Sequence, residues 1–189
     1  MIEYRTPDGI SLRAEVLEPN IIRIQAGGFD GYQPSLLERY GLVNALEAAT
    51  GTQESGPAIL LPDGTALTLE DGPLFKLTRD DADLVAPLAS TKVATAPTLH
   101  RNQGFQLDLP LARGEKLIGF GDHQRQQFLL NGLRDSLWIQ YPVKHVPVPF
   151  FMSNRGYGIF FNTTRRLYFD VGASDLDIAK FAVQNAFLD

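Results

Sequence analysis

The sequence predicts an all-β fold, an antiparallel β-sandwich with one short helix. Apolar residues alternate with polar ones over short runs, as they do in half-buried strands. The 17 glycines and 12 prolines are spread along the chain and predict many turns. Successive strands joined by short turns favour antiparallel pairing over βαβ units. The sequence contains no internal repeat, low-complexity tract or linker, so we expect residues 1–189 to form one domain.

Two hairpins are predicted in the N-terminal third of the chain. Residues 12–16 and 22–24 alternate in polarity on either side of Glu18-Pro19-Asn20, which interrupts the run. Asp63-Gly64 separates two further apolar runs, and this dipeptide is typical of a tight hairpin turn.

Residues 35–50 are the best helix candidate. Ser35 and Glu38 have the spacing of a capping box, in which each side chain bonds the other residue's backbone. Gly41 weakens the prediction because glycine disfavours a helix interior. The alternative is a strand through residues 39–43.

A small acidic cluster, Asp80, Asp81 and Asp83, follows the strand predicted at 74–78. These carboxylates lack the glycine turn and the distal glutamate of a calcium loop, so a solvated loop or edge is favoured over a metal site. The C-terminal half alternates more clearly and predicts strands at 105–109, 157–161, 167–171 and 179–183.

Composition excludes several classes of function. The net charge is −5 and no long basic run occurs, which argues against a nucleic-acid partner. Cysteine is absent, so neither disulfides nor thiolate metal sites are expected. The N-terminus lacks the features of a secretory signal, and no apolar run approaches a membrane span. We therefore expect a cytoplasmic protein with no membrane partner, no cofactor and no bound metal.

Gly119-Phe120-Gly121-Asp122 is the first candidate for a special backbone shape. Glycines at alternate positions let the chain turn tightly or approach another element. No third glycine follows at the spacing of a dinucleotide-binding loop. We interpret the segment as a structural bend whose acid bonds nearby backbone donors, rather than as a catalytic group.

Trp138, the only tryptophan, is the best candidate for ligand binding. Aromatic rings stack on the apolar faces of sugars, and polar neighbours bond the hydroxyl groups. Arg134, Asp135 and Gln140 are close in sequence and complete a candidate sugar platform. The alternative is a tryptophan in the core of the sandwich. Arg165-Arg166 is interpreted as a solvated hairpin turn.

The segment Pro149-Phe-Phe-Met-Ser-Asn-Arg-Gly-Tyr-Gly158 predicts a strand, a turn at 154–156 and a second strand. This string, together with the Phe-Asp-Val-Gly of residues 169–172, closely resembles the N-terminal domain of glycoside hydrolase family 31, the α-glucosidase and α-xylosidase family. The similarity covers roughly residues 117–189, and the preceding residues are similar in their strand-rich character.

The resemblance implies a galactose-mutarotase-like β-sandwich that belongs to a longer enzyme. In the family, a retaining mechanism uses two aspartates of a (β/α)8 barrel, which we expect after residue 189. No catalytic residue is therefore assigned in this chain. The implied partners are the chain's own downstream barrel and an α-linked oligosaccharide or glycoside, and any homo-oligomer would form through the parent enzyme.

The resemblance also bears on the candidate site. Family members often have Trp-Asn-x-Asp on a loop over the barrel mouth, where this chain has Trp138-Ile-Gln140-Tyr141. Tyr141 replaces the aspartate, which puts a direct hydrogen bond to substrate in doubt. Trp138, Tyr141, Arg134 and Gln140 are the candidate substrate-binding residues.

Two other functions stay open. One is a stand-alone carbohydrate-binding module centred on Trp138. The other is a mutarotase-like epimerase, which needs a histidine and a carboxylate in one groove, with His123 or His145 as candidates. Both rest on analogy of fold alone. With His100, the three histidines show no spacing typical of a zinc site.

Overall fold

The computed structural model describes residues 1–27, 34–42, 52–92, 104–122, 127–138, 146–183 and 187–189. Within these ranges regular structure is almost entirely β-strand, and the paired strands run antiparallel. The predicted all-β antiparallel fold is confirmed. No helix among the described residues is long and apolar enough to cross a membrane.

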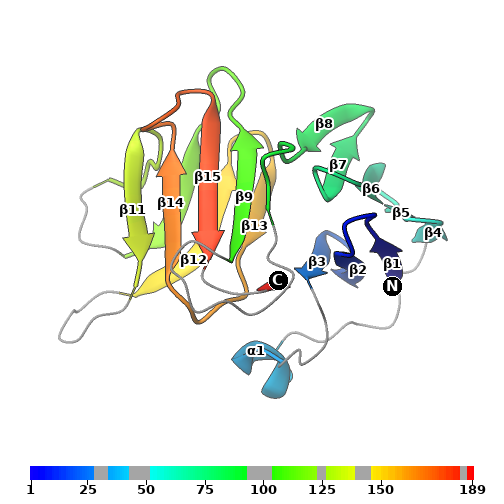
Figure 1. Ribbon diagram of the computed structural model, residues 1–189. Helices are drawn as coiled ribbons and strands as arrows, with labels where there is room; N and C mark the ends of the chain where they lie inside the picture. The colour runs from blue at the N-terminus through cyan, green and yellow to red at the C-terminus, as the bar shows by residue number, and fades with distance from the viewer. Residues whose placement is uncertain (28–33, 43–51, 93–103, 123–126, 139–145, 184–186) are drawn as a thin grey trace.

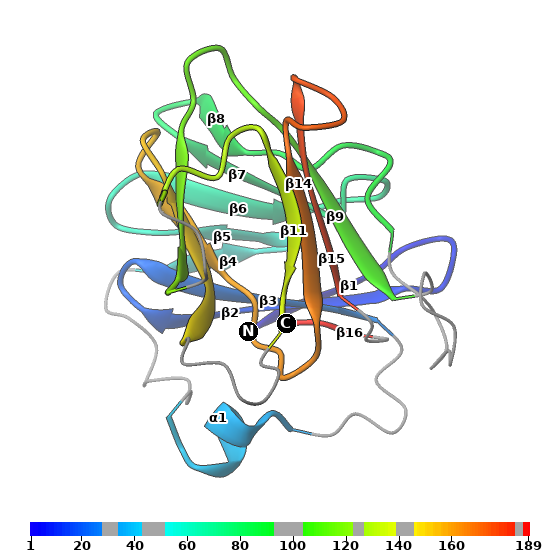
Figure 2. The same ribbon diagram turned by 90° about the vertical axis from the view of Figure 1, so that its left-hand side faces the viewer.

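Two sheets face each other in the C-terminal half. One has the order β11 (Leu133–Leu137), β14 (Leu167–Val171), β15 (Ile178–Val183), β9 (Phe105–Pro110), and the other has the order β10 (Leu117–Gly121), β12 (Pro147–Ser153), β13 (Tyr157–Phe160). Figure 1 shows the four-stranded sheet in front of the three-stranded one, and Figure 2 shows the two layers side by side. This arrangement is the predicted sandwich.

Two further sheets are built mainly from the N-terminal half. One has the order β1 (Ile2–Arg5), β2 (Ser11–Glu18), β3 (Ile21–Gly27), β16 (Phe187–Leu188), and the other has the order β4 (Gln53–Ser55), β5 (Ala58–Leu60), β6 (Thr65–Leu69), β7 (Phe75–Arg79), β8 (Ala82–Val85). In Figure 2 their strands run across the direction of β11 and β14. Buried apolar side chains from all four sheets belong to one connected core.

Aromatic rings fill the space between the two sandwich sheets. Phe151 of β12 stacks on Phe181 of β15, with ring centroids 4.8 Å apart and planes 11° apart. Phe120 of β10 lies 4.8 Å from Phe169 of β14. Phe161 joins the same group, 5.4 Å from Phe181. These rings come from both layers, so apolar burial and ring contacts hold the layers together.

The predicted hairpins are confirmed. β2 pairs with β3, and β5 pairs with β6 through the turn that contains Asp63 and Gly64. Asp63 accepts hydrogen bonds from the backbone and side chain of Thr65, and these bonds outweigh slight burial and lower the pKa of Asp63. The acidic cluster also behaves as expected, because Asp80 and Asp81 form a turn with positive φ and β8 is an edge strand.

The predicted helix is much shorter than expected. The Ser35–Glu38 capping box is present, but α1 spans only Leu36–Arg39. Gly41 adopts a φ of +67°, and its N–H bonds the carbonyl of Glu38, which ends the helix. Residues 40–42 are not a strand, so the alternative was also wrong there. Residues 43–50 lie outside the described part.

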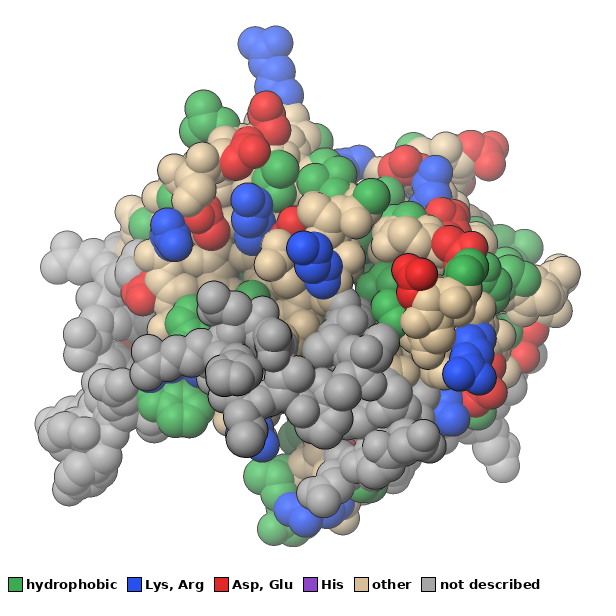
Figure 3. Space-filling view, viewed as in Figure 1, with side chains coloured by type: hydrophobic (Ala, Val, Ile, Leu, Met, Phe, Trp, Pro, Cys, Tyr) green, Lys and Arg blue, Asp and Glu red, His purple; other side chains and the backbone are tan. Residues whose placement is uncertain are grey.

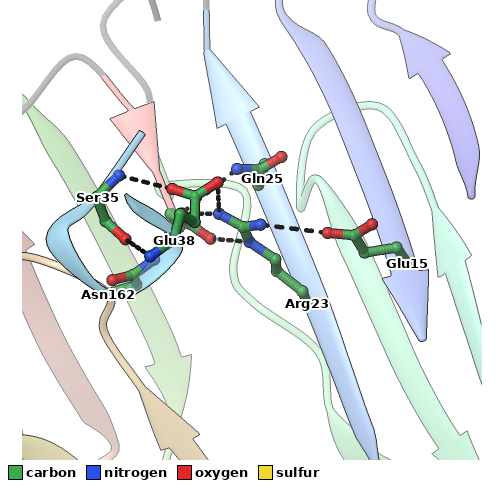
Figure 4. A network of polar contacts seen from close by, with 7 residues as sticks. Glu15, Arg23, Gln25, Ser35, Glu38 and Asn162 are labelled. Atoms are coloured by element: carbon green, nitrogen blue, oxygen red, sulfur yellow. Dashed lines mark hydrogen bonds and ion pairs between the residues drawn. The ribbon is translucent and has the colours of Figure 1, made fainter. Parts of the chain in front are cut away.

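Arg23 of β3 connects this helix to the sheet. Figure 4 shows its guanidinium between carboxylates, with Nη1 3.2 Å from Glu15 Oε1 and Nη2 2.8 Å from Glu38 Oε1. Its Nε donates to Asp189 Oδ1 over 2.6 Å. Burial alone would lower the pKa of Arg23, but the bonds to Asp189 and Glu38 outweigh it and raise the pKa. Since no residue of α1 is buried, the ion pair between Arg23 and Glu38 is a main attachment of the helix to the sheet.

Candidate functional site

Trp138 lies directly after β11, at the edge of the four-stranded sheet. Leu137 is buried and pairs with Leu167 of β14, so alternation turns the next side chain to the outer face. Trp138 is 47% exposed. The alternative of a core tryptophan is therefore wrong, because an outward position at a strand end cannot bury the indole in the sandwich.

Two side chains accompany Trp138, namely Tyr168 of β14 and Arg166, which directly precedes that strand. The Arg166 guanidinium carbon lies 5.3 Å from the centre of the Trp138 ring and 5.8 Å from that of Tyr168. Such contacts are favourable cation–π pairs. Arg165 is exposed at a bend, as predicted, but Arg166 is half-buried against aromatic rings. The connection leads from β13 to β14 in the other sheet, so the prediction of a hairpin was wrong.

The structure does not bring Arg134 to Trp138. Both residues point outward from β11, but they are four positions apart along an extended strand, a distance of about 13 Å. Arg134 instead lies near Asp170, with Nε and Oδ2 3.8 Å apart. Burial opposes the charge of Asp170, but hydrogen bonds from Ser174 and Ala173 outweigh it and lower the pKa of Asp170.

The other candidate positions are placed as follows. Asp135 is exposed on β11, opposite Phe169. Gln140 and Tyr141 lie outside the described residues, so their part in the site stays a prediction. Sequence reasoning missed Arg166 and Tyr168 as neighbours of Trp138. Only the pairing of β11 with β14 places them there, and no local pattern specifies which strand is the partner.

The glycine segment of β10 forms the predicted bend. Gly119, Phe120 and Gly121 have φ angles of 156°, 70° and 67° in succession. The pairing with β12 changes register across them, from Gly119 opposite Phe151 to Gly121 opposite Pro147. A positive φ is costly for phenylalanine. The bend turns the Phe120 ring into the core, where it is fully buried.

A buried carboxylate supports the turn between β12 and β13. The Glu115 side chain is almost fully buried, and its Oε1 accepts hydrogen bonds from Ser153 Oγ at 2.6 Å and Tyr157 Oη at 2.7 Å. Its Oε2 accepts the backbone N–H of Ala112 at 3.0 Å. All these partners are donors, so the carboxylate is satisfied as an ion. The sequence analysis did not single out Glu115, because no local pattern marks it.

This cluster makes stability depend on pH in the alkaline range. Burial, reinforced by the bond to Glu115 and its charge, raises the pKa of Tyr157 above the ordinary value of 10.0. The folded protein therefore keeps the proton above pH 10, where the unfolded chain releases it, and stability falls as pH rises further. We expect Tyr157→Phe to lower the free energy of unfolding by about 2 kcal/mol at pH 7.

Urea denaturation of both proteins between pH 7 and 11 measures this effect. The difference between the parent protein and Tyr157→Phe should shrink above pH 10, since the phenylalanine cannot titrate. A constant difference across this range would contradict the assignment of the shift to Tyr157.

No metal site is evident in the part of the chain that the structure describes, where no three His, Asp or Glu side chains gather suitably. His100, His123 and His145 all lie outside that part. The histidine and carboxylate of the epimerase hypothesis therefore stay untested.

The two facing antiparallel sheets and their shared core define a galactose-mutarotase-like β-sandwich. Residues 11–170 match the glycosyl hydrolase 31 N-terminal galactose mutarotase-like domain, and the chain belongs to this family. The predicted membership is confirmed. No curated protein sequence matches the chain.

Solved structures with the same fold belong to longer enzymes. A family 31 α-xylosidase from a soil metagenome, complexed with xylose, matches 99% of this chain with a TM-score of 0.70 and 15% identity. A dextranase from Flavobacterium johnsoniae, complexed with glucose, matches 95% with a TM-score of 0.64 and 19% identity. An α-xylosidase from Xanthomonas citri matches 89% with a TM-score of 0.63 and 20% identity. The chain spans 30%, 23% and 18% of their respective lengths.

Proposed function

We propose that this chain is the non-catalytic N-terminal domain of a retaining α-glycosidase of the α-glucosidase or α-xylosidase type, acting in the cytoplasm. The observation that carries the proposal is the family match over residues 11–170. The α-xylosidases and the dextranase that share the fold support an α-linked glycoside as substrate. Two aspartates of a barrel outside this chain would carry out the hydrolysis.

The domain's own role in this proposal is to pack on the barrel and to complete the rim of the substrate site. The segment that follows β11 would form that part of the rim, with Trp138, Gln140 and Tyr141. The half-exposed indole of Trp138 supports this role, because it offers an apolar surface on which a sugar ring can stack.

The reading frame beyond codon 189 and the activity of its product test the proposal. We expect the frame to continue into alternating strand and helix patterns, and the full polypeptide to hydrolyse an aryl α-glucoside or α-xyloside with retention of configuration. A stop codon directly after Asp189, or a full polypeptide inactive on both substrates, would overturn it.

Within that polypeptide, we expect Trp138→Ala to weaken substrate binding. Loss of one aromatic stacking contact costs about 1 kcal/mol, which corresponds to a rise of roughly fivefold in KM for an oligosaccharide. The turnover number should change less, because the rim does not touch the reacting bond. Leu176→Ala, in the exposed turn between β14 and β15 at the other end of the sheet, is the matched control. An unchanged KM would remove Trp138 from the site.

A carbohydrate-binding module is the second candidate, because the exposed Trp138 ring and the half-buried Tyr168 ring lie on either side of the Arg166 guanidinium on the outer face. Trp138 is the only tryptophan, so fluorescence excited in the indole band reports this site alone. Saturable quenching of the 189-residue chain by maltose or xylobiose, weakened by Tyr168→Ala, would favour the module. If no quenching occurs up to about 1 mM sugar, the binding free energy is weaker than about 4 kcal/mol, and the glycosidase domain is favoured.

A further inference from the structure

Strand register brings Trp138 and Arg166 together on the outer face of the four-stranded sheet. Leu137 of β11 pairs with Leu167 of β14, and both side chains are buried. Continuing this antiparallel register by one residue places Trp138 opposite Arg166, and directly opposed residues point to the same face of a sheet. Since Leu137 and Leu167 point into the core, the next side chains on both strands point outward.

Tyr168 provides the second ring beside the guanidinium of Arg166. It follows the buried Leu167 along β14, so it points outward like Arg166, two positions away. It pairs with Ser136 on one side and with Ala182 on the other. Both of these side chains are small, so they leave room for the guanidinium, whose carbon lies 5.8 Å from the centre of the Tyr168 ring.

The surroundings of Arg166 differ from those of other cations on the same face. Arg134 and Lys180 both lie opposite Asp170 in the strand ladder, and Figure 3 shows acidic and basic side chains interspersed over this sheet. The guanidinium carbon of Arg166 instead lies over the Trp138 ring, 5.3 Å from its centre. A planar guanidinium stacks well on aromatic faces. Arg166 is therefore placed to hold an aromatic ring.

The contact with Arg166 restricts the indole of Trp138. Trp138 follows the last residue of β11 and is 47% exposed, so core packing does not fix its ring. The guanidinium covers one face of the ring, and the exposed surface lies mainly away from Arg166. A side chain that is ordered before binding loses less conformational entropy when a ligand binds. The arrangement therefore suits a ring that meets a ligand in one orientation.

We propose that Arg166 is a positioning residue for Trp138, which fixes the indole so that a sugar ring stacks on the face that the guanidinium leaves open. Tyr168 holds the guanidinium in place from the sheet. Arg166 acts through Trp138 and makes no substrate contact of its own. This inference rests on the proposed function, because it takes Trp138 as part of the rim of the substrate site.

Time-resolved fluorescence anisotropy tests the restraint on the indole, because Trp138 is the only tryptophan of the 189-residue chain. We expect Arg166→Ala to raise the amplitude of the subnanosecond depolarisation at least about twofold, since exposed side chains change rotamer in that time range. Arg165→Ala is the matched control, because Arg165 is exposed at the neighbouring position and should leave the amplitude unchanged. An unchanged amplitude in Arg166→Ala would overturn the inference.

Kinetics of the full-length polypeptide test whether this restraint assists substrate binding. We expect Arg166→Ala to raise KM for an oligosaccharide roughly threefold and to leave kcat unchanged, because ordering the indole opposes binding and not the chemical step. In the Trp138→Ala background, Arg166→Ala should have no further effect.

Two kinetic outcomes would contradict the role of Arg166. A KM at the parent value in Arg166→Ala, beside a raised KM in Trp138→Ala, would overturn the inference and leave the proposed function intact. Equal effects of Arg166→Ala with and without Trp138 would show that Arg166 binds the substrate itself, which also overturns it.

Discussion

Gly121→Ala should lower the free energy of unfolding by about 3 kcal/mol. The φ of Gly121 is 67°, a conformation that costs an L-residue about 1 kcal/mol. An added Cβ would also lie 2.4 Å from the carbonyl oxygen of Val146 and 2.8 Å from the nitrogen of Val148. These contacts are backbone atoms of a paired strand, so relief requires β10 and β12 to separate, at about 2 kcal/mol.

Gly156→Ala is the matched control for this prediction. Gly156 also has a positive φ, 89°, but nothing lies within 4 Å of its added Cβ. Only the conformational cost of about 1 kcal/mol remains. Urea denaturation followed by circular dichroism measures both variants. Equal losses of stability for the two glycines would show that the close approach of β10 to β12 contributes nothing.

Phe151→Ala should lower the free energy of unfolding by about 4 kcal/mol, the usual range for a buried phenylalanine. The Phe151 ring is fully buried, stacks on Phe181 and meets Phe120 edge to face at 6.0 Å. Its removal leaves a cavity between the two sheets. Well-packed neighbours held in strands from both layers cannot collapse into it fully.

Phe128→Ala provides the comparison, because that ring is 74% exposed and its removal should change stability by less than about 0.5 kcal/mol. The two variants remove the same atoms from different environments. A loss of less than about 1 kcal/mol for Phe151→Ala would mean that the aromatic layer does not hold the two sheets together.

The aromatic layer also decides how the two outer faces are oriented. Rings from β10 and β12 pack on rings from β14 and β15, so the inner faces of both sheets are fixed against each other. The opposite side of each strand must then point outward. One outer face consequently presents Trp138 and charged side chains, and the other presents exposed apolar side chains such as Ile118, Met152 and Phe160.

Local signals predicted much of this structure. Alternation of polarity located the strands at 105–109 and 167–171, and Asp63-Gly64 located a hairpin, because side-chain direction and turn geometry are set by adjacent residues. The helix prediction failed over residues 40–42, because Gly41 ended the helix after one turn. Apolar spacing alone could not show where the chain leaves the helix.

The sequence by itself determined the all-β class, the family and the bend at Gly119 to Gly121, since each depends on residues that are neighbours along the chain. Only the tertiary structure decided that Trp138 is exposed and accompanied by Arg166 and Tyr168, that Glu115 is buried among donors, and that one outer face is apolar. The physical reason is that these properties depend on which strand pairs with which. That pairing is set by burial across the whole core and not by any local pattern.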